Sequence, residues 1–276
     1  MSQFLLDNAA ALRLAVFGFV LLTLAVIEVM APRRQQSVGR LARWPNNLAV
    51  VLIDTLAVRL LIPVTLAGFA AYAGVRGWGL FNQLAVPEWL SLPGSILLLD
   101  LAIYAQHVAF HVVPLFWRLH RMHHADLEFD VTTGVRFHPL EIVLSVLFKL
   151  ALILGLGPPA VAVLLFEIIL NGMALFSHSN IALPGGLDAM LRTVVVTPDM
   201  HRVHHSVERA ETDSNFGFNL SLWDRLFGTY RVEPAAGQLG MTIGIAQFRE
   251  PGELRLDRLL TQPFRDDASK NLDRPS

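Results

Sequence analysis

Three short stretches of the chain concentrate histidines at spacings that suit metal binding. The eight side chains are His107 and His111 in HVAFH, His120, His123 and His124 in HRMHH, and His201, His204 and His205 in HRVHH. On a helix, positions i, i+3 and i+4 share one face, so each HxxHH box presents three imidazoles from one turn. Eight nitrogens are too many for one ion, whereas two ions with about four or five histidines each would use all eight. An imidazole-rich, carboxylate-poor site suits iron, zinc, copper or nickel.

The two remaining histidines stand alone, His138 in RFHPLE and His178 in LFSHSN. A lone histidine is more often hydrogen-bonded or solvated than bound to metal. A pH sensor would also use histidines, but it does not require the same HxxHH spacing twice. Metal binding is therefore the interpretation that the three boxes favour.

The composition indicates a membrane protein. Of 276 residues, 53% are hydrophobic and 16% charged, with a mean hydropathy of +0.48, which is more apolar than soluble domains. The net charge of −1 argues against nucleic-acid binding. With no cysteine in the chain, disulfides and thiolate metal ligands are excluded. MSQFLLDNAA lacks the basic start of a signal peptide, so we expect Met1 onward to be mature protein.

Hydropathy predicts an all-α integral membrane bundle of about three single spans plus a helical hairpin. Spans need about 20 apolar residues, and we expect them at about 14–30, 48–73 and 90–113. The apolar stretch 142–176 is too long for one crossing and contains GLGPP, so it predicts a hairpin that returns to the same side. Lys149 and Glu167, at similar depth on its two arms, are expected to pair.

Positive charges in the short loops predict the orientation. Arginines concentrate in 32–46 and 114–140, whereas loop 74–89 has only Arg76. The N-terminus is therefore expected outside, and a helical cap that carries the histidine boxes, with the C-terminus, in the cytoplasm. The expected divisions are N-terminal transmembrane helices (1–89), a core with the boxes (90–232) and a polar tail (233–276).

Residues 90–232 resemble the membrane fatty acid hydroxylase and sterol desaturase superfamily. HVAFH, FWRLHRMHH and TPDMHRVHH occur in that order, together with RFHPLE, LFSHSN and NFGFNLSLWDRLFGTYR. The resemblance implies an oxidoreductase with two iron ions per chain that uses O2 to hydroxylate or desaturate a sterol-like or fatty-acyl lipid; zinc is a possible substitute for iron. It implies that the ligands are the eight box histidines together with His138 and His178.

Several polar residues are candidates to orient a ligand imidazole by hydrogen bonding to its second ring nitrogen. They are Asp100, Tyr104, Asn180 and Asp199, with Asn215 and Asn219 as further candidates. The regions before the first span and after Tyr230 are too short for a haem domain, so electrons are expected from a separate ferredoxin, cytochrome or reductase. The alternatives are a zinc-dependent membrane hydrolase, for which the chain lacks an HExxH motif, and a membrane metal transporter, whose ligands would lie near the bilayer midplane.

Overall fold

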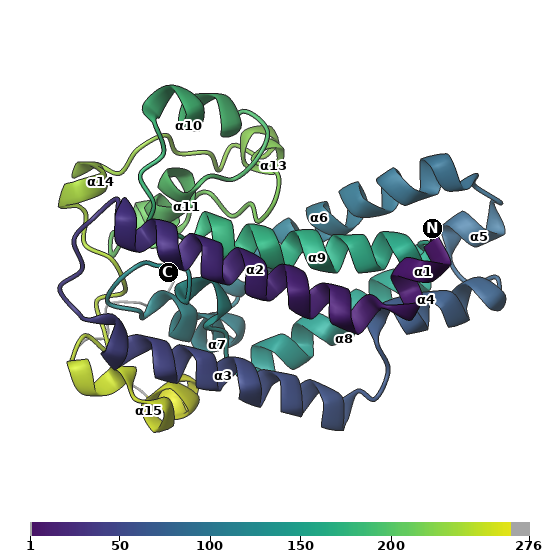
Figure 1. Cartoon of the computed structure of the whole chain (residues 1–276), viewed down its shortest axis with the longest axis horizontal. Helices are drawn as coiled ribbons and strands as arrows, with labels where there is room; N and C mark the ends of the chain where they lie inside the picture. The colour runs from purple at the N-terminus through teal and green to yellow at the C-terminus, as the bar shows by residue number, and fades with distance from the viewer. Residues whose placement is uncertain (1, 266–276) are drawn as a thin grey trace.

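The structure is a computed structural model that describes residues 2–265, and helices dominate it (Figure 1). Extended residues in this part of the chain pair only in three isolated bridges, so no strand forms within it. The predicted all-α fold is confirmed. Residues 266–276 of the expected polar tail lie outside the described residues.

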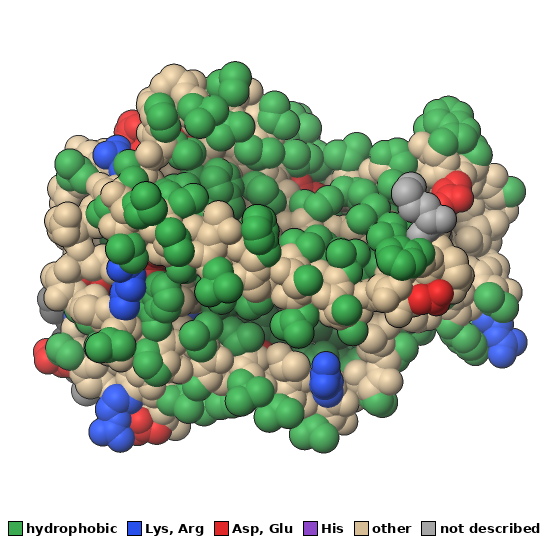
Figure 2. All heavy atoms as spheres, viewed as in Figure 1, with side chains coloured by type: hydrophobic (Ala, Val, Ile, Leu, Met, Phe, Trp, Pro, Cys, Tyr) green, Lys and Arg blue, Asp and Glu red, His purple; other side chains and the backbone are tan. Residues whose placement is uncertain are grey.

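Five segments of the described chain are long and apolar enough to cross a membrane. Their long helices are α2 (Ala9–Met30), α3 (Arg40–Leu61), α6 (Glu88–Val112), α8 (Pro139–Leu156) and α9 (Ala160–Ser177). Figure 2 shows that hydrophobic side chains dominate the face formed by α2 and α3. The predicted count of three single spans and two hairpin arms is confirmed.

The second predicted span, 48–73, is not one helix. α3 ends at Leu61, and α4 (Leu66–Val75) begins after a four-residue break. Pro63 causes the break, because proline lacks the N–H that a helix needs and disfavours helical geometry at the residue before it. The side chain of Thr65 then caps α4 by accepting a hydrogen bond from the Gly68 backbone N–H (3.0 Å).

The hairpin between α8 and α9 turns at Gly157, as GLGPP predicts. Gly157 has a φ of +66°, a conformation that glycine adopts without steric cost. A Cβ at this position would lie 2.5 Å from both the Trp78 carbonyl oxygen and the Asn82 side chain. The turn therefore packs directly against the segment that precedes α6.

The core lies around α9, which packs against α2, α4 and α6. Its largest cluster includes Leu66, Leu99 and Phe166. The expected Lys149–Glu167 ion pair does not form among the described residues; Arg13 of α2 bonds the Glu167 carboxylate instead (2.8 Å). Hydropathy placed Arg13 just outside the first span, so it was not considered as a partner.

The remaining helices are short, and most gather at the end of the bundle where α2 and α9 end and α3 and α8 begin (Figure 1). At this end lie α7 (Pro114–His124), η1 (Thr133–Val135), α10 (Gly185–Leu191), α11 (Pro198–His204), α12 (Arg209–Thr212), α13 (Leu222–Leu226), α14 (Gly237–Gly240), η2 (Pro251–Leu254), α15 (Leu256–Thr261) and η3 (Gln262–Phe264). The opposite end carries α1 (Ser2–Asp7), α4 and α5 (Leu80–Gln83). Leu259 of α15 packs with Val50 and Met122, so the described part of the polar tail is an integral piece of this end.

Candidate metal centre

Nine of the ten histidines converge into two buried groups. All nine are at most 3% exposed, and within each group one ligand atom per histidine lies within 4.8 Å of all the others. The five-histidine group consists of His107, His111, His120, His124 and His204. The four-histidine group consists of His123, His178, His201 and His205.

Each HxxHH box serves both groups, because its three imidazoles do not point in one direction. Successive helical residues turn by about 100°, so i and i+4 differ by only about 40°, whereas i+3 and i+4 differ by about 100°. In α7, His120 and His124 therefore enter the five-histidine group and His123 the four-histidine group. The HRVHH box, which lies in α11 and the residue after it, is divided the other way round. Its outer histidines, His201 and His205, enter the four-histidine group, and His204 enters the five-histidine group. Both boxes thus join the two groups.

The ring tautomers in the five-histidine group favour a cation between the rings. His107 Nδ1 lies 2.7 Å from the Phe216 carbonyl oxygen, and His204 Nδ1 lies 2.7 Å from that of Ser214. A carbonyl can only accept a hydrogen bond, so both rings donate from Nδ1 and carry a bare lone pair on Nε2. These two Nε2 atoms are nevertheless 3.1 Å apart. Two facing lone pairs repel each other unless a metal ion binds both.

The four-histidine group repeats this arrangement around His178. Its Nδ1 donates to the Ala174 carbonyl oxygen (2.7 Å), which leaves a lone pair on Nε2. The Nε2 atoms of His123, His201 and His205 all lie within 3.1–3.2 Å of it. One lone pair cannot accept three hydrogen bonds at once, so a shared cation explains this packing better than hydrogen bonding does.

Burial keeps the histidines neutral, which metal binding requires. Burial, reinforced by repulsion from neighbouring rings, holds the pKa of His201, His204 and His205 well below its usual value, and burial lowers the pKa of His178 to about 3. Several buried ring nitrogens also have no hydrogen-bond partner, among them His111 Nε2 and both nitrogens of His124. The donor set therefore fits transition-metal ions, with the lone pairs available as ligands.

Two carboxylates that we did not predict orient histidines of the five-histidine group. Glu141 Oε1 lies 2.7 Å from His120 Nδ1, and Asp213 Oδ1 lies 3.3 Å from His111 Nδ1. Acceptors at the second nitrogen fix the tautomer and make the ring a better ligand. Glu141 is the last residue of RFHPLE, the motif that contains His138, and the sequence around Asp213 carries no recognisable signal.

His138 lies apart from both groups. It precedes α8, where its Nδ1 accepts a hydrogen bond from the Leu140 backbone N–H (3.2 Å). Its Nε2 donates to the Leu260 carbonyl oxygen (3.1 Å). Both nitrogens are thus used to start α8 and to hold α15, and the structure does not bring this predicted ligand to the other nine.

The four polar residues expected to orient imidazoles bond other partners. Asp100 accepts hydrogen bonds from Asn219 Nδ2 and Trp223 Nε1 (both 2.7 Å), and the Tyr104 hydroxyl bonds Thr229 Oγ1 (2.8 Å). The other two bond arginines of the loop after α2: Asn180 pairs with the backbone of Arg34, and Asp199 with the Arg33 side chain. The prediction of direct contact with a ligand ring was wrong for these residues, which instead anchor the segments that carry the rings.

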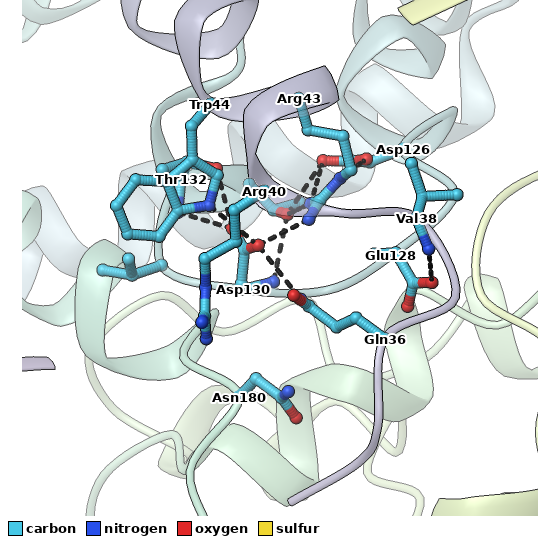
Figure 3. A network of polar contacts seen from close by, with 12 residues as sticks. Gln36, Val38, Arg40, Arg43, Trp44, Asp126, Glu128, Asp130, Thr132 and Asn180 are labelled. Atoms are coloured by element: carbon cyan, nitrogen blue, oxygen red, sulfur yellow. Dashed lines mark hydrogen bonds and ion pairs between the residues drawn. The ribbon is translucent and has the colours of Figure 1, made fainter. Parts of the chain in front are cut away.

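A buried ionic network holds the segment that follows α7 (Figure 3). Arg43 of α3 donates to both carboxylate oxygens of Asp126 (2.7 Å each) and pairs with Asp130, and all three side chains are fully buried. Gln36 and Trp44 also donate to Asp130. Since Asp126 comes two residues after His124, this network fixes where the HRMHH box ends.

The geometry defines a helical bundle, apolar enough to span a membrane, with two histidine-rich groups at one end that could hold metal ions. The profile of the family described as fatty acid hydroxylase matches residues 92–229, half of the chain, and it includes all nine clustered histidines. The chain therefore belongs to the fatty acid hydroxylase family.

Several characterised proteins are similar to this chain. Ornithine lipid hydroxylase OlsE of Rhizobium tropici is 30% identical over 159 residues, which cover 55% of this chain and 46% of the relative. Human alkylglycerol monooxygenase is 30% identical over 163 residues, covering 59% and 35%. Very-long-chain aldehyde decarbonylase GL1-1 of Oryza sativa subsp. indica is 29% identical over 195 residues, covering 67% and 30%. The chain thus spans less than half the length of these relatives, and no solved structure matches it.

Proposed function

We propose that this protein is a membrane-bound oxidoreductase that hydroxylates a lipid with O2 at a pair of iron ions. The observation that carries the proposal is the convergence of nine buried histidines into two adjoining groups with facing lone pairs. Membership of the fatty acid hydroxylase family supports this chemistry. One iron would be held by the five-histidine group and the other by the four-histidine group.

Iron bound in this way supplies the activation of O2 that an unreactive C–H bond requires. The reaction balances as one lipid C–H bond, one O2, two electrons and two protons giving one C–OH group and one water. The chain's own contribution is to keep nine rings neutral, to orient five of them through hydrogen bonds at Nδ1, and to exclude bulk water by burial. Electrons would come one at a time from a separate ferredoxin or cytochrome, or from a reductase.

A lipid is the substrate class that the position of the groups favours. Phe218 is half-buried, and its ring centroid lies 4.9 Å from that of His107 and 6.4 Å from that of His201. On its other side Phe218 packs against the apolar cluster between α4, α6, α8 and α9. A lipid chain among the spans would therefore reach the histidines past Phe218. The names of the relatives, a lipid hydroxylase and an alkylglycerol monooxygenase, favour hydroxylation of a polar lipid over desaturation.

The loop charges favour an orientation with the N-terminus outside and both histidine groups in the cytoplasm. Both groups lie at the bundle end where loop 32–39 connects α2 to α3 (Figure 1). This arrangement would place the metal ions on the side where reduced electron carriers are available.

Metal analysis and Mössbauer spectroscopy of protein purified in mild detergent from cells grown with iron-57 test the proposal. We expect two irons per chain with the signal of a coupled pair, and a hydroxylated lipid on comparing lipids of cells with and without the protein. Zinc alone would call for anaerobic reconstitution with ferrous iron. Failure to bind iron even then would overturn the proposal.

A further inference from the structure

Two short helices at the histidine end carry an exposed apolar surface that the proposed chemistry does not use. We call residues 185–194 and 220–227, which include α10 and α13, the apolar lobe. Its exposed large side chains are Leu187, Met190, Val194, Leu222, Leu226 and Phe227, at 40–65% exposure. Figure 2 shows hydrophobic side chains gathered over the part of the molecule where Figure 1 labels α10. Contiguous apolar surface of this kind marks a site of interaction.

The two parts of the lobe form one unit. The Ser221 backbone N–H donates to the Val194 carbonyl oxygen (3.0 Å), and Val195 pairs with Leu220 in an antiparallel bridge. The Arg192 carbonyl oxygen accepts from the Ser221 hydroxyl (2.8 Å) and from the Arg225 guanidinium (2.9 Å). The exposed apolar side chains are therefore held on a single scaffold.

Contacts with α6 place the lobe at the depth of a membrane-spanning helix. Trp223 Nε1 donates to Asp100 (2.7 Å), and the Phe227 ring stacks on Tyr104 with centroids 5.4 Å apart. α6 continues to Val112, so Tyr104 and Asp100 lie about 12 and 18 Å before its end at about 1.5 Å per residue. The lobe thus lies beside a part of α6 well inside its end.

Charge and aromatic side chains at the edge of the lobe match a membrane interface. Arg225 is exposed, and its guanidinium lies over the Tyr230 ring at 3.9 Å. The carboxylates of the lobe are turned inward: Asp188 pairs with Arg192, and Asp224 accepts hydrogen bonds from the backbone of Phe216 and Gly217. An exposed arginine and a partly exposed tyrosine beside apolar side chains are typical of elements that lie at the lipid headgroups.

We propose that the apolar lobe is embedded in the lipid–water boundary of the same membrane that α6 spans. Lipid acyl chains would cover the exposed apolar side chains, and Arg225 would lie at the level of the lipid phosphates. The contacts of the lobe with Asp100 and Tyr104, well inside the end of α6, favour lipid over a protein partner as the occupant. This membrane contact does not depend on metal binding or on turnover.

The chain lacks cysteine, so single-cysteine variants can carry one nitroxide spin label each in protein reconstituted into phospholipid nanodiscs. Leu226→Cys probes the lobe, and Met190→Cys repeats the test on α10 if the first variant does not accumulate. Leu239→Cys is the matched control, since Leu239 is 65% exposed like Leu226 but lies on α14, which Figure 1 shows at the left edge of the molecule, beyond the ends of α2 and α9. Leu56→Cys, exposed on α3, is the control for a lipid-facing position.

Collisions with O2, which dissolves in the bilayer, and with a water-soluble nickel chelate give the readout. We expect the label at 226 to resemble that at 56, with an oxygen-to-nickel collision ratio several-fold above that at 239. A ratio equal to that at 239 would overturn the proposal, because the lobe would then face water. Shielding from both reagents, with dipolar broadening between labels, would overturn it in favour of a second copy of the chain. None of these results depends on bound iron, so the test stands apart from that of the proposed function.

Discussion

The separation of His138 from the other nine histidines leads to a prediction about metal content. His204→Ala removes a lone pair that faces His107 at 3.1 Å and should cause loss of iron from the five-histidine group. His138→Ala removes only two backbone hydrogen bonds and should leave the iron content close to that of the unsubstituted protein. Iron per chain, measured on both purified variants, checks this. Equal losses in the two variants would return His138 to the ligand set.

Glu141 should control how tightly the five-histidine group retains its metal. Loss of a carboxylate that orients a ligand imidazole typically costs about 10–100-fold in metal affinity. We expect Glu141→Gln to lose iron to a chelator correspondingly faster. Glu167→Gln is the control, because Glu167 is also a carboxylate in a span but bonds Arg13 and no histidine. Chelator competition, followed by absorbance, measures the rate of iron loss from both variants. Similar rates in the two variants would contradict a specific role for Glu141.

Phe218 should influence which carbon of the lipid reacts. Phe218→Ala widens the approach between the apolar core and His107, whereas Phe218→Trp narrows it. We expect the hydroxylation position, or the accepted chain length, to shift in opposite directions in the two variants while iron content stays constant. Mass spectrometry of the products reads out the position. An unchanged product pattern in both variants would show that the substrate does not pass Phe218.

At the scale of elements, the side chain of Arg43 on α3 holds the segment that follows α7. Removing one partner of a buried ion pair costs about 3–5 kcal/mol, so Arg43→Ala should lower the thermal unfolding midpoint strongly and weaken iron binding at the end of α7. Arg255→Ala is the control, because Arg255 and Asp257 form an exposed ion pair (3.1 Å), and such pairs contribute about 0–1 kcal/mol. The thermal unfolding midpoints of both variants, measured in nanodiscs, test this prediction. Equal shifts would mean that the Arg43 network does not hold α7.

Hydropathy and spacing predict some elements of this chain well, for a physical reason. The five crossings and the turn at Gly157 follow from local composition, and i, i+3 and i+4 spacing identifies histidines that converge on two groups. Local patterns do not show which residue of a distant segment is the partner in a tertiary contact. For this reason Glu141, the Phe216 carbonyl oxygen and Arg13 were missed, and Asp100 was given a partner that it does not have.

The whole molecule should depend on an external electron source. A separate donor implies that purified, iron-loaded protein with NADPH alone is inactive, and that adding a ferredoxin with its reductase starts product formation. Product measured by mass spectrometry, with and without the donor, tests this. Turnover with NADPH alone would show that the chain accepts electrons from the nicotinamide directly.

The division of the HRVHH box between both groups has a consequence for how the protein is made in the cell. His204 joins the five-histidine group with His107, 97 positions earlier in the chain, while His201 and His205 complete the four-histidine group. The five-histidine group is therefore complete only after position 204 and the four-histidine group only after position 205, by which time all five apolar segments have been synthesised. Under the proposed function, iron delivery would be a late step of biogenesis, and a nascent chain cut short before α11 would enter the membrane with neither histidine group complete.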